Sequence, residues 1–466
     1  MQLCVFKKDD WQCPETALEG KDLCIFHDKS DWPYQNANTL ANTLKERIES
    51  RLSPGNKEDP VRFDGAIFPE ADIYIRTYER SVSFAGAEFH RAFFDGAKFL
   101  GKVTSFEGAK FKNARFEGVE FSGDVVFKKA QFSEGSNFKN AIFSCNKNKN
   151  KIDFTEASFQ EGVFFDDAEL RSETISFAKV RFAGNISFIG TKFYCKDHIS
   201  FESAQFGRPG FVGSHAKTIF RGEEPGGIFL EGKVNFKSVA IDQEEFIFEW
   251  VNLSQVEFLD TDISKVKFID VEWYKRPNFL KFFGGWRSRL YDEDVWRETR
   301  KKNRGIDDHY LTQLSYLYRT LKRYYLDRGE INLVGHFHYG FMEVLLRKEK
   351  RILKRILSLQ HLYRISSGYG EDYGLAIIVL LTLILLFGGI YTILEVPKVY
   401  EDRSWIPDQF LNSLLYSFQA ATLSRISFYQ ESLVWLPAKY LHLMESILAP
   451  AQFAFVVIAL RNRFRR

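Results

Sequence analysis

Three cysteines and one histidine near the N-terminus are the residues of this 466-residue chain best suited to metal chemistry. Cys4, Cys13, Cys24 and His27 lie in one short segment, and only two residues separate the last pair. Two ligands at that spacing can reach one ion from a single turn of chain. Thiolates and imidazoles are the ligands that Zn²⁺ prefers in closed tetrahedral sites. The pattern therefore predicts a structural zinc site, and the alternative is three reduced thiols beside a surface histidine.

The short length of this segment favours a bound metal ion over three reduced thiols. So short a piece of chain has little apolar core, and metal binding would supply its folding free energy. No further ligand of the same kind lies nearby, so the closed set indicates structure rather than catalysis. Five cysteines in 466 residues are too few for a disulfide framework, and no basic-then-apolar leader begins the chain. We expect most of the protein to face a reducing cytoplasm.

Composition excludes several classes of protein. The length predicts two or three structural units, and 47 phenylalanines beside three methionines indicate one core position repeated many times. A net charge of +3, from 64 basic and 61 acidic residues, argues against a chain that wholly binds or mimics a polyanion. Apolar residues make up 45% of the chain and charged residues 27%, which excludes intrinsic disorder and a polytopic transporter. No serine, histidine and aspartate grouping, phosphate-binding glycine loop or carboxylate pair stands out, so we expect no enzyme.

Phenylalanine recurs every five residues between Val61 and Trp273, with a small residue two positions before each ring. A period of five fits neither the 3.6 of a helix nor the 2 of a strand. It fits a chain that turns a corner every five residues and points one large and one small side chain inward. The phenylalanines predicted to form this core are Phe84, Phe89, Phe94, Phe99, Phe106, Phe111, Phe116 and Phe121.

This repeat resembles the pentapeptide-repeat family in its phenylalanine-rich form. The resemblance implies a right-handed quadrilateral β-helix over residues 61–273, with roughly nine or ten coils. Six-residue spacings such as Phe121 to Phe127 are expected to bulge at corners. Some members of the family mimic a nucleic acid duplex with acidic faces, but Lys98 and Lys110 are interleaved with the acids here. We expect a surface that binds a cytoplasmic protein or ligand, and no nucleic acid partner.

Helical patterns flank the repeat. Residues 1–35 hold the Cys/His segment, and residues 36–60 are expected to form a helical linker. Residues 274–371 are predicted to form a basic helical connector of two helices, with a break at Asp327-Arg-Gly and a second amphipathic run over 335–359. Its basic clusters precede an apolar segment, so the membrane surface is the expected partner.

Residues 372–466 predict a membrane domain with two spans. From Tyr373 to Leu394 there is no charged residue, and this length crosses about 30 Å of hydrocarbon. A second apolar stretch runs from Tyr440 to Leu460. Basic residues crowd before the first span and after the second, which predicts an inner-membrane protein with both termini and the repeat on the cytoplasmic side.

Two residues interrupt the second span. Glu445 is costly inside a membrane unless it faces water or a partner, so a functional or assembly role is expected. Hydration at the membrane boundary is the competing explanation. Pro450 is expected to kink the helix and serve as a gate hinge.

A short apolar helix ending near Thr422 lies between the spans. The order of span, short helix, small-residue turn and span resembles the two-transmembrane pore-loop ion channels, which implies a homotetramer in a lipid bilayer. The filter candidates are Thr422, Leu423, Ser424, Arg425, Ile426 and Ser427. Glycine is absent from this segment although a carbonyl-lined filter favours it, so a typical potassium filter is not expected. Arg425 either faces the pore, where it favours anions, or lies among the lipid headgroups.

Three functions remain open from the sequence. The first is a membrane ion channel that its cytoplasmic pentapeptide-repeat domain gates as a sensor. The second is a membrane-anchored scaffold whose repeat binds a protein without any conduction. The third, which the mixed charges disfavour, is a nucleic acid mimic. Two spans cannot enclose a pore alone, so the first function requires oligomers.

Overall fold

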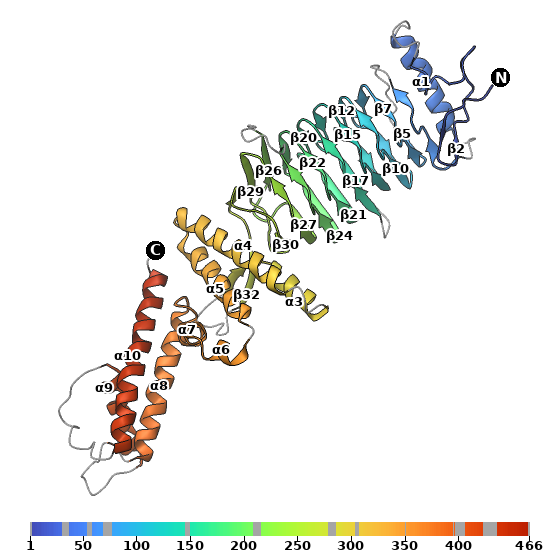
Figure 1. The fold of residues 1–466 in the computed structure, drawn as a ribbon. Coiled ribbons are helices and arrows are strands. Elements are labelled where there is room, and N and C mark those ends of the chain that lie inside the picture. The colour runs from blue at the N-terminus through green and yellow to red at the C-terminus, as the bar shows by residue number, and fades with distance from the viewer. Residues whose placement is uncertain are drawn as a thin grey trace. The chain divides into compact units, whose positions relative to one another are not determined.

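The computed structural model describes residues 2–29, 37–53, 58–68, 77–144, 150–207, 216–277, 286–302, 307–349, 351–394, 396, 406–422 and 436–464. The chain divides into two compact units. One comprises residues 1–274 with 290–299, and the other comprises residues 275–289 with 300–466. The first unit carries the N-terminal segment and the repeat, and the second carries most of the helices (Figure 1).

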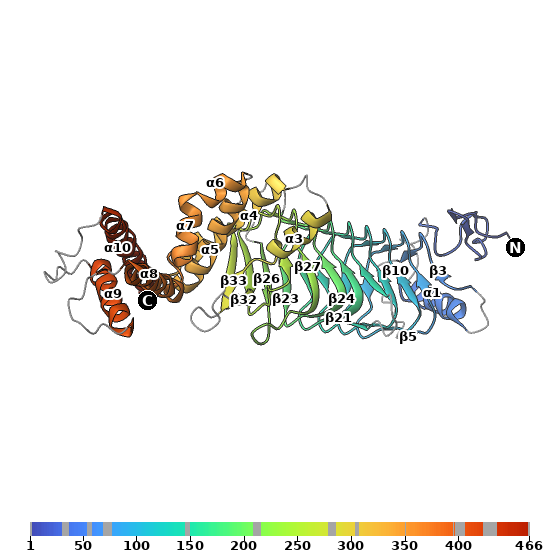
Figure 2. The same cartoon turned by 90° about the horizontal axis from the view of Figure 1, so that it is seen from below.

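The repeat folds as a β-solenoid of short parallel strands, which Figure 2 shows as stacked coils. One eight-stranded sheet contains β4 (Ile67–Phe68), β7 (Glu88–Phe89), β11 (Lys110–Phe111), β15 (Gln131–Phe132), β19 (Ser158–Phe159), β22 (Arg181–Phe182), β25 (Gln205–Phe206) and β28 (Ala240–Ile241). A second contains β8 (Ala92–Phe93), β12 (Ala114–Arg115), β16 (Ser136–Asn137), β20 (Val163–Phe164), β23 (Ile186–Ile189), β26 (Lys217–Arg221), β29 (Glu245–Glu249) and β31 (Val266–Ile269).

The remaining two rows of strands merge into a single sheet, because long strands later in the solenoid run past a corner and pair with both rows. Its 13 strands are β3 (Val61–Arg62), β5 (Thr77–Tyr78), β6 (Val82–Ser83), β9 (Lys98–Phe99), β10 (Val103–Ser105), β13 (Glu120–Phe121), β14 (Asp124–Val126), β17 (Ile142–Ser144), β18 (Lys151–Asp153), β21 (Glu169–Ser176), β24 (Lys192–Ser200), β27 (Phe229–Asn235) and β30 (Val256–Glu257). β21 pairs with both β17 and β18.

Eight strands in each of two sheets make a solenoid of about eight turns, fewer than the nine or ten expected. The difference arises because the turns lengthen along the chain. Ile67 lies opposite Glu88 in the first turns, 21 residues away, whereas Gln205 lies opposite Ala240, 35 residues away.

All eight predicted core phenylalanines are buried, with at most 6% of their surface exposed. Rings at equivalent positions of successive coils stack face to face. Phe116 lies 5.1 Å from Phe94 and 4.8 Å from Phe138 between ring centroids. Neighbours within a coil meet edge to face, as Phe111 and Phe116 do at 5.8 Å. Both arrangements suit the quadrupole of an aromatic ring, so the core is a continuous aromatic stack.

One kind of corner is a tight turn with one left-handed residue. At one of these corners, the Ala87 amide donates to the Phe84 carbonyl across Gly86, whose φ is +68°. Lys129 and Asn140 adopt the same left-handed conformation at corners of later coils, although glycine adopts it at a lower energetic cost. The extra residue between Phe121 and Phe127 lies at a corner, as expected, but at one of the other kind, between β13 and β14, where none of the described residues is left-handed.

The remaining elements are short hairpins and helices. The first unit contains the antiparallel pair β1 (Lys7–Lys8) and β2 (Trp11–Gln12), together with α1 (Ala37–Leu52) and most of α3 (Asp292–Lys302). The helices of the second unit are α4 (Asp307–Asp327), α5 (Ile331–Lys348), α6 (Ile352–Ile356), α7 (Leu359–Ser367), α8 (Tyr373–Ile393), α9 (Ile406–Ala421) and α10 (Leu436–Phe464), preceded by the strand pair β32 (Tyr274–Pro277) and β33 (Trp286–Arg289).

The connector differs from the predicted pair of helices, because it begins with the strand pair β32 and β33 and because its second helical run is divided. The break after Asp327 is present, and α4 packs along α5. The second run does not continue to residue 359, because α5 ends at Lys348 and Arg351 has an extended backbone. The apolar residues beyond this point belong to α6 and α7 instead.

After the last coil of the solenoid, a side chain takes the place of the backbone carbonyl that a further coil would provide. In the preceding turns the Phe236 amide donates to the Glu257 carbonyl one coil later, at 2.8 Å. The equivalent Phe258 amide donates to Asp292 Oδ1, at 2.9 Å, because no coil follows. Burial and the neighbouring Glu257 raise the pKa of the fully buried Asp292 from 3.8 to about 8.

The aromatic stack yields a direct prediction. Truncation of the fully buried Phe116 to alanine removes contacts to three coils, and we expect it to cost about 3 to 5 kcal/mol in urea unfolding of the full chain. Lys98→Ala removes only an exposed ion pair with Glu120 and should cost less than about 1 kcal/mol. Equal losses for the two variants would show that the repeat register is wrong.

Asp292 predicts a pH dependence of stability. Its pKa is raised in the folded state, so the fold favours the protonated carboxyl, and stability falls as pH rises from about 4 to 8. We expect a slope of up to about 1.4 kcal/mol per pH unit in thermal unfolding, which Asp292→Asn should remove. Asp294→Asn on the same helix is the control and should keep the wild-type slope. An unchanged slope in Asp292→Asn would contradict the assignment.

Candidate metal centre and three-helix unit

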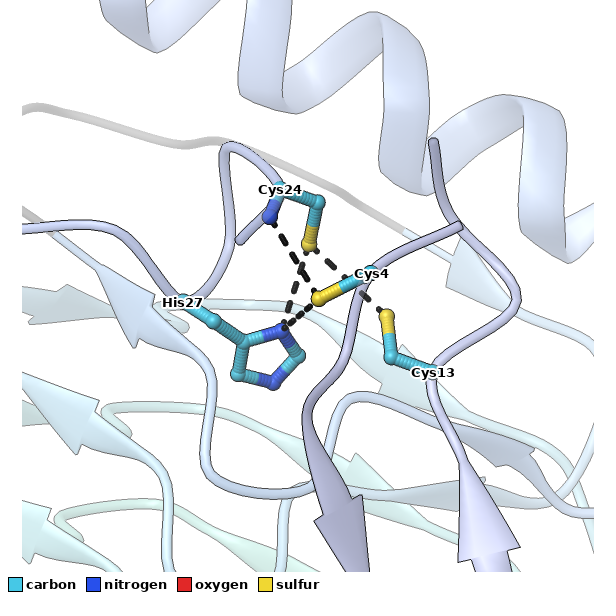
Figure 3. Close-up of side chains that lie close together, drawn as sticks. All are labelled: Cys4, Cys13, Cys24 and His27. Atoms are coloured by element: carbon cyan, nitrogen blue, oxygen red, sulfur yellow. Dashed lines mark hydrogen bonds between the residues drawn. The ribbon is translucent and has the colours of Figure 1, made fainter. Parts of the chain in front are cut away.

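The four predicted metal ligands are positioned by two local structures. Cys4 and Cys13 lie on either side of the β1–β2 hairpin. The chain from Cys24 to His27 forms one tight turn, because the amides of His27 and Asp28 both donate to the Cys24 carbonyl at 3.0 Å. This turn places the side chains of Cys24 and His27 on the same side of the chain. Figure 3 shows all four side chains pointing at one another.

Their geometry suits a tetrahedral ion. The four ligand atoms lie within 4.8 Å of one another, and all four residues are buried. The Sγ atoms of Cys13 and Cys24 are 3.7 Å apart, and His27 Nδ1 lies 3.6 Å from Cys4 Sγ and 3.2 Å from Cys24 Sγ. Ligands on a tetrahedral zinc ion with bonds of about 2.3 Å lie about 3.8 Å apart. The prediction that these residues come together is confirmed, and the cluster could hold a metal ion.

Neighbouring groups set the histidine tautomer. His27 Nε2 lies 3.0 Å from the Asp64 carbonyl oxygen, which can only accept a hydrogen bond. The proton therefore sits on Nε2, and Nδ1 has a lone pair free for an ion. The Phe6 ring stacks on the imidazole at 3.8 Å and keeps it in place. No spacing pattern indicated Asp64 as a partner, because it lies 37 residues beyond His27 in the first coil.

The contact between Cys13 and Cys24 shifts the pKa values of these two thiols in opposite directions. The hydrogen bond between Cys13 and Cys24 lowers the pKa of Cys13 to about 4, and the same bond, with burial, raises the pKa of Cys24. A cysteine must be a thiolate to bind a metal ion. The lowered pKa therefore favours a thiolate at Cys13, and a bound cation would favour loss of the Cys24 proton.

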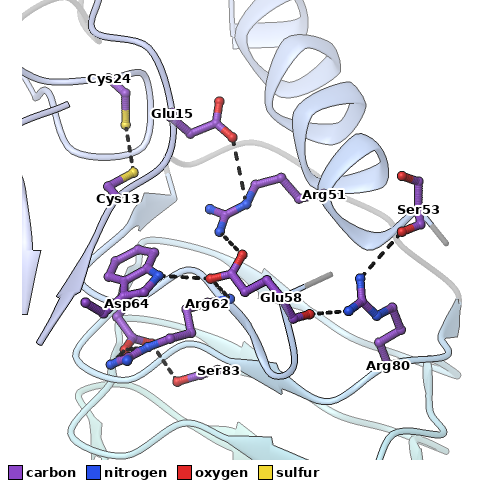
Figure 4. Close-up of polar contacts among 11 residues, drawn as sticks. Cys13, Glu15, Cys24, Arg51, Ser53, Glu58, Arg62, Asp64, Arg80 and Ser83 are labelled. Atoms are coloured by element: carbon purple, nitrogen blue, oxygen red, sulfur yellow. Dashed lines mark hydrogen bonds and ion pairs between the residues drawn. The ribbon is translucent and has the colours of Figure 1, made fainter. Parts of the chain in front are cut away.

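A network of polar contacts joins this segment to α1 and the first coils (Figure 4). The half-buried Glu58 accepts a hydrogen bond from Trp11 Nε1 at 2.9 Å and pairs with Arg51 at 2.7 Å. The Arg51 guanidinium lies 4.8 Å from the Phe63 ring centroid and 3.8 Å from Glu15, whose pKa is raised because it is buried. None of these residues was singled out from the sequence.

In the second unit, α9 packs against both α8 and α10. The buried Ser417 hydroxyl of α9 lies 3.0 Å from the Ile384 carbonyl of α8 and also contacts Glu445 Oε1 of α10. Glu445 has no exposed surface. The Glu445 carboxylate therefore links α10 to the short helix α9. Its predicted functional or assembly role stays a prediction.

Further side-chain hydrogen bonds join α10 to α7, α8 and α9. Gln452 Nε2 donates to the Ser366 carbonyl at 2.8 Å and to the Ala376 carbonyl at 2.9 Å. Tyr416 of α9 contacts His442 of α10 at 3.2 Å. α10 continues through Pro450, so a hinge at that residue stays a prediction.

Two helices of this unit are long and apolar enough to cross a membrane, over Tyr373–Ile393 and Lys439–Phe464. Only 28% of the most apolar window of each is buried, whereas a core helix of a soluble protein would be mostly buried. The exposed apolar residues of these helices are Leu381, Leu385, Leu386, Ile393, Leu443, Met444, Ile447, Leu448, Phe453, Val457 and Phe464.

The predicted filter is largely outside the part of the chain that the structure describes. α9 ends at Ala421, and the Thr422 hydroxyl donates to the Phe418 carbonyl within the last turn. The five filter candidates beyond it are Leu423, Ser424, Arg425, Ile426 and Ser427, and all lie outside the described residues.

Comparison with known proteins agrees with the solenoid. A family model described as pentapeptide repeats (9 copies) matches residues 79–130 and 106–146. This region includes all eight predicted core phenylalanines. No curated protein and no solved structure matches the chain. The aromatic stack, the tight corners and this match together identify the β-solenoid of the chain as one built from pentapeptide repeats.

Proposed function

We propose that the chain is an oligomeric membrane channel whose pentapeptide-repeat solenoid acts as a cytoplasmic sensor. The observation that carries the proposal is the short apolar helix α9, which lies between two candidate spans and is held to both through Ser417. A pore-lining loop needs such a helix, wedged between the membrane helices of its own subunit. Two spans per chain then require several copies, and the pore-loop resemblance implies four.

The surface of α8 and α10 supports a bilayer as the environment of this unit. Soluble monomers rarely expose a contiguous apolar surface of this kind, because its hydration is unfavourable. Lipid tails or a second copy of the chain would cover it.

The segment just before α8 supports the same environment. Leu353, Leu357 and Leu359 of α6, α7 and their junction are 75 to 83% exposed, beside the basic residues Lys354 and Arg355. Exposed leucines with flanking positive charges are typical of helices that lie in the interface of an anionic membrane. Basic residues here and at the end of α10 favour a cytoplasmic position for both termini and for the solenoid.

The exterior of the solenoid disfavours nucleic acid mimicry. Charges of opposite sign pair between neighbouring coils, as Lys110 does with Glu88 at 3.0 Å and Arg115 with Asp95 at 2.6 Å. Basic groups therefore interrupt any row of acidic groups that could imitate the phosphates of a nucleic acid. The same surface suits a protein partner, so a membrane-anchored scaffold is the second candidate function. In neither function does the chain act as an enzyme.

The channel proposal predicts a change of ion selectivity. In planar bilayers with asymmetric salt, we expect Arg425→Ala to shift the reversal potential toward higher relative cation permeability, because a ring of guanidinium groups repels cations in a narrow passage. Lys439→Ala removes a charge at the start of α10 and should leave the reversal potential unchanged. An unchanged potential in Arg425→Ala would place this residue outside the conduction path. Absence of current from assembled wild-type oligomers would favour the scaffold.

We also propose that zinc is the ion of the Cys4, Cys13, Cys24 and His27 cluster. Three soft sulfur ligands and one imidazole match its preference, and a site closed by four protein ligands leaves no open position for catalysis.

Metal analysis of the purified full chain tests this proposal. We expect about one zinc ion per chain, and a loss of most of it in Cys24→Ser, because a site with three remaining ligands binds zinc far more weakly. Cys195→Ala is the matched control, since Cys195 is equally buried but lies within the solenoid. A zinc content far below one per chain that Cys24→Ser does not change would remove the site.

A further inference from the structure

The backbone hydrogen bonds between coils leave several groups of the first coil in need of partners, and two of them lie beside the Cys/His segment. Along one row of strands, each coil donates to the next, as Gly65 N does to the Ala85 carbonyl at 2.9 Å. Along another row the direction is reversed, as Glu88 N donates to the Ala66 carbonyl at 2.8 Å. Toward the coil before it, a coil therefore accepts hydrogen bonds along the first row and donates them along the second.

The register identifies these two groups in the first coil. Val61 pairs with Val82, so Asp64 corresponds to Ala85, and its carbonyl oxygen needs a donor. Ile67 pairs with Glu88, so the Ile67 amide needs an acceptor. No coil precedes them to supply either.

The metal-ligand turn supplies both. His27 Nε2 donates to the Asp64 carbonyl at 3.0 Å, where a preceding coil would place a backbone amide. The Phe26 carbonyl accepts from the Ile67 amide at 2.7 Å, where a preceding coil would place its own carbonyl. Two adjacent residues of the Cys/His segment thus reproduce two of the hydrogen bonds that a preceding coil would make.

Side chains of the same segment extend the aromatic stack. Phe26 is buried, and its ring centroid lies 5.6 Å from Phe63 and 6.3 Å from Phe68. Phe6 lies over Gly65 so closely that a Cβ atom there would be 2.2 Å from the Phe6 ring. The segment therefore covers the end of the core as a further coil would.

We propose that the metal centre is a surrogate first coil, and that metal binding closes the N-terminal end of the solenoid. The inference rests on the zinc site proposed above. The ion would join the turn that carries Phe26 and His27 to the hairpin that carries Phe6, and this segment has little other core. When the ion is removed, the segment separates from the first coil and exposes an unpaired sheet edge, while the later coils keep their stack.

Hydrogen exchange on the full chain in detergent tests the proposal. After zinc is removed with a chelator, we expect amides of residues 58–68 to exchange at least about tenfold faster, because they lose their cover. Amides of residues 158–182, in the middle of the solenoid, are the internal control and should not change. Added Zn²⁺ should restore the protection. If residues 58–68 stay protected in protein shown to be free of metal, the proposal is wrong.

A second variant separates this role from metal binding itself. His27→Cys keeps four zinc ligands but cannot donate to the Asp64 carbonyl. We expect it to bind one zinc ion and yet to leave residues 58–68 exchanging several-fold faster than in wild type. Full zinc content with wild-type protection would overturn the surrogate coil and leave the zinc site standing. Absence of zinc from the wild-type protein would instead refute the zinc proposal.

Discussion

The hydrogen bonds between successive coils are the constraint on which the first unit depends. Each coil satisfies its backbone groups only through its neighbours, so a stack of coils has unpaired groups at both ends. The chain meets this need with residues outside the repeat. Asp292 accepts from Phe258 after the last coil, and the turn holding Phe26 and His27 serves the first. Segments that the pentapeptide pattern does not describe thus complete its fold.

The same need appears among the apolar helices of the second unit. Carbonyls of α8 are reached by side chains from the neighbouring helices, Ser417 at Ile384 and Gln452 at Ala376. In a membrane, polar side chains are stable only with such internal partners, and they fix how helices meet when apolar packing alone does not. Glu445 belongs to this network, which is why a buried carboxylate fits inside an apolar helix.

Most of the correct predictions came from the spacing of residues within one segment of the sequence. The five-residue period placed all eight core phenylalanines, and the Cys/His spacing identified ligand atoms that do converge. The number of turns was overestimated because insertions lengthen later coils without breaking the phenylalanine pattern. The helical run over 335–359 was also read as one element, since amphipathic spacing continues across the extended residue Arg351, where the chain leaves α5.

The sequence by itself determined which side chains point inward, which four residues could share an ion, and which helices are apolar enough for a membrane. Each of these follows from spacing or composition within one segment. Only the tertiary structure decided that Asp64 orients His27, that Asp292 ends the solenoid, and that Ser417 meets Glu445. The members of each pair lie 28 or more residues apart, and their contact depends on how whole elements stack, which no local pattern records.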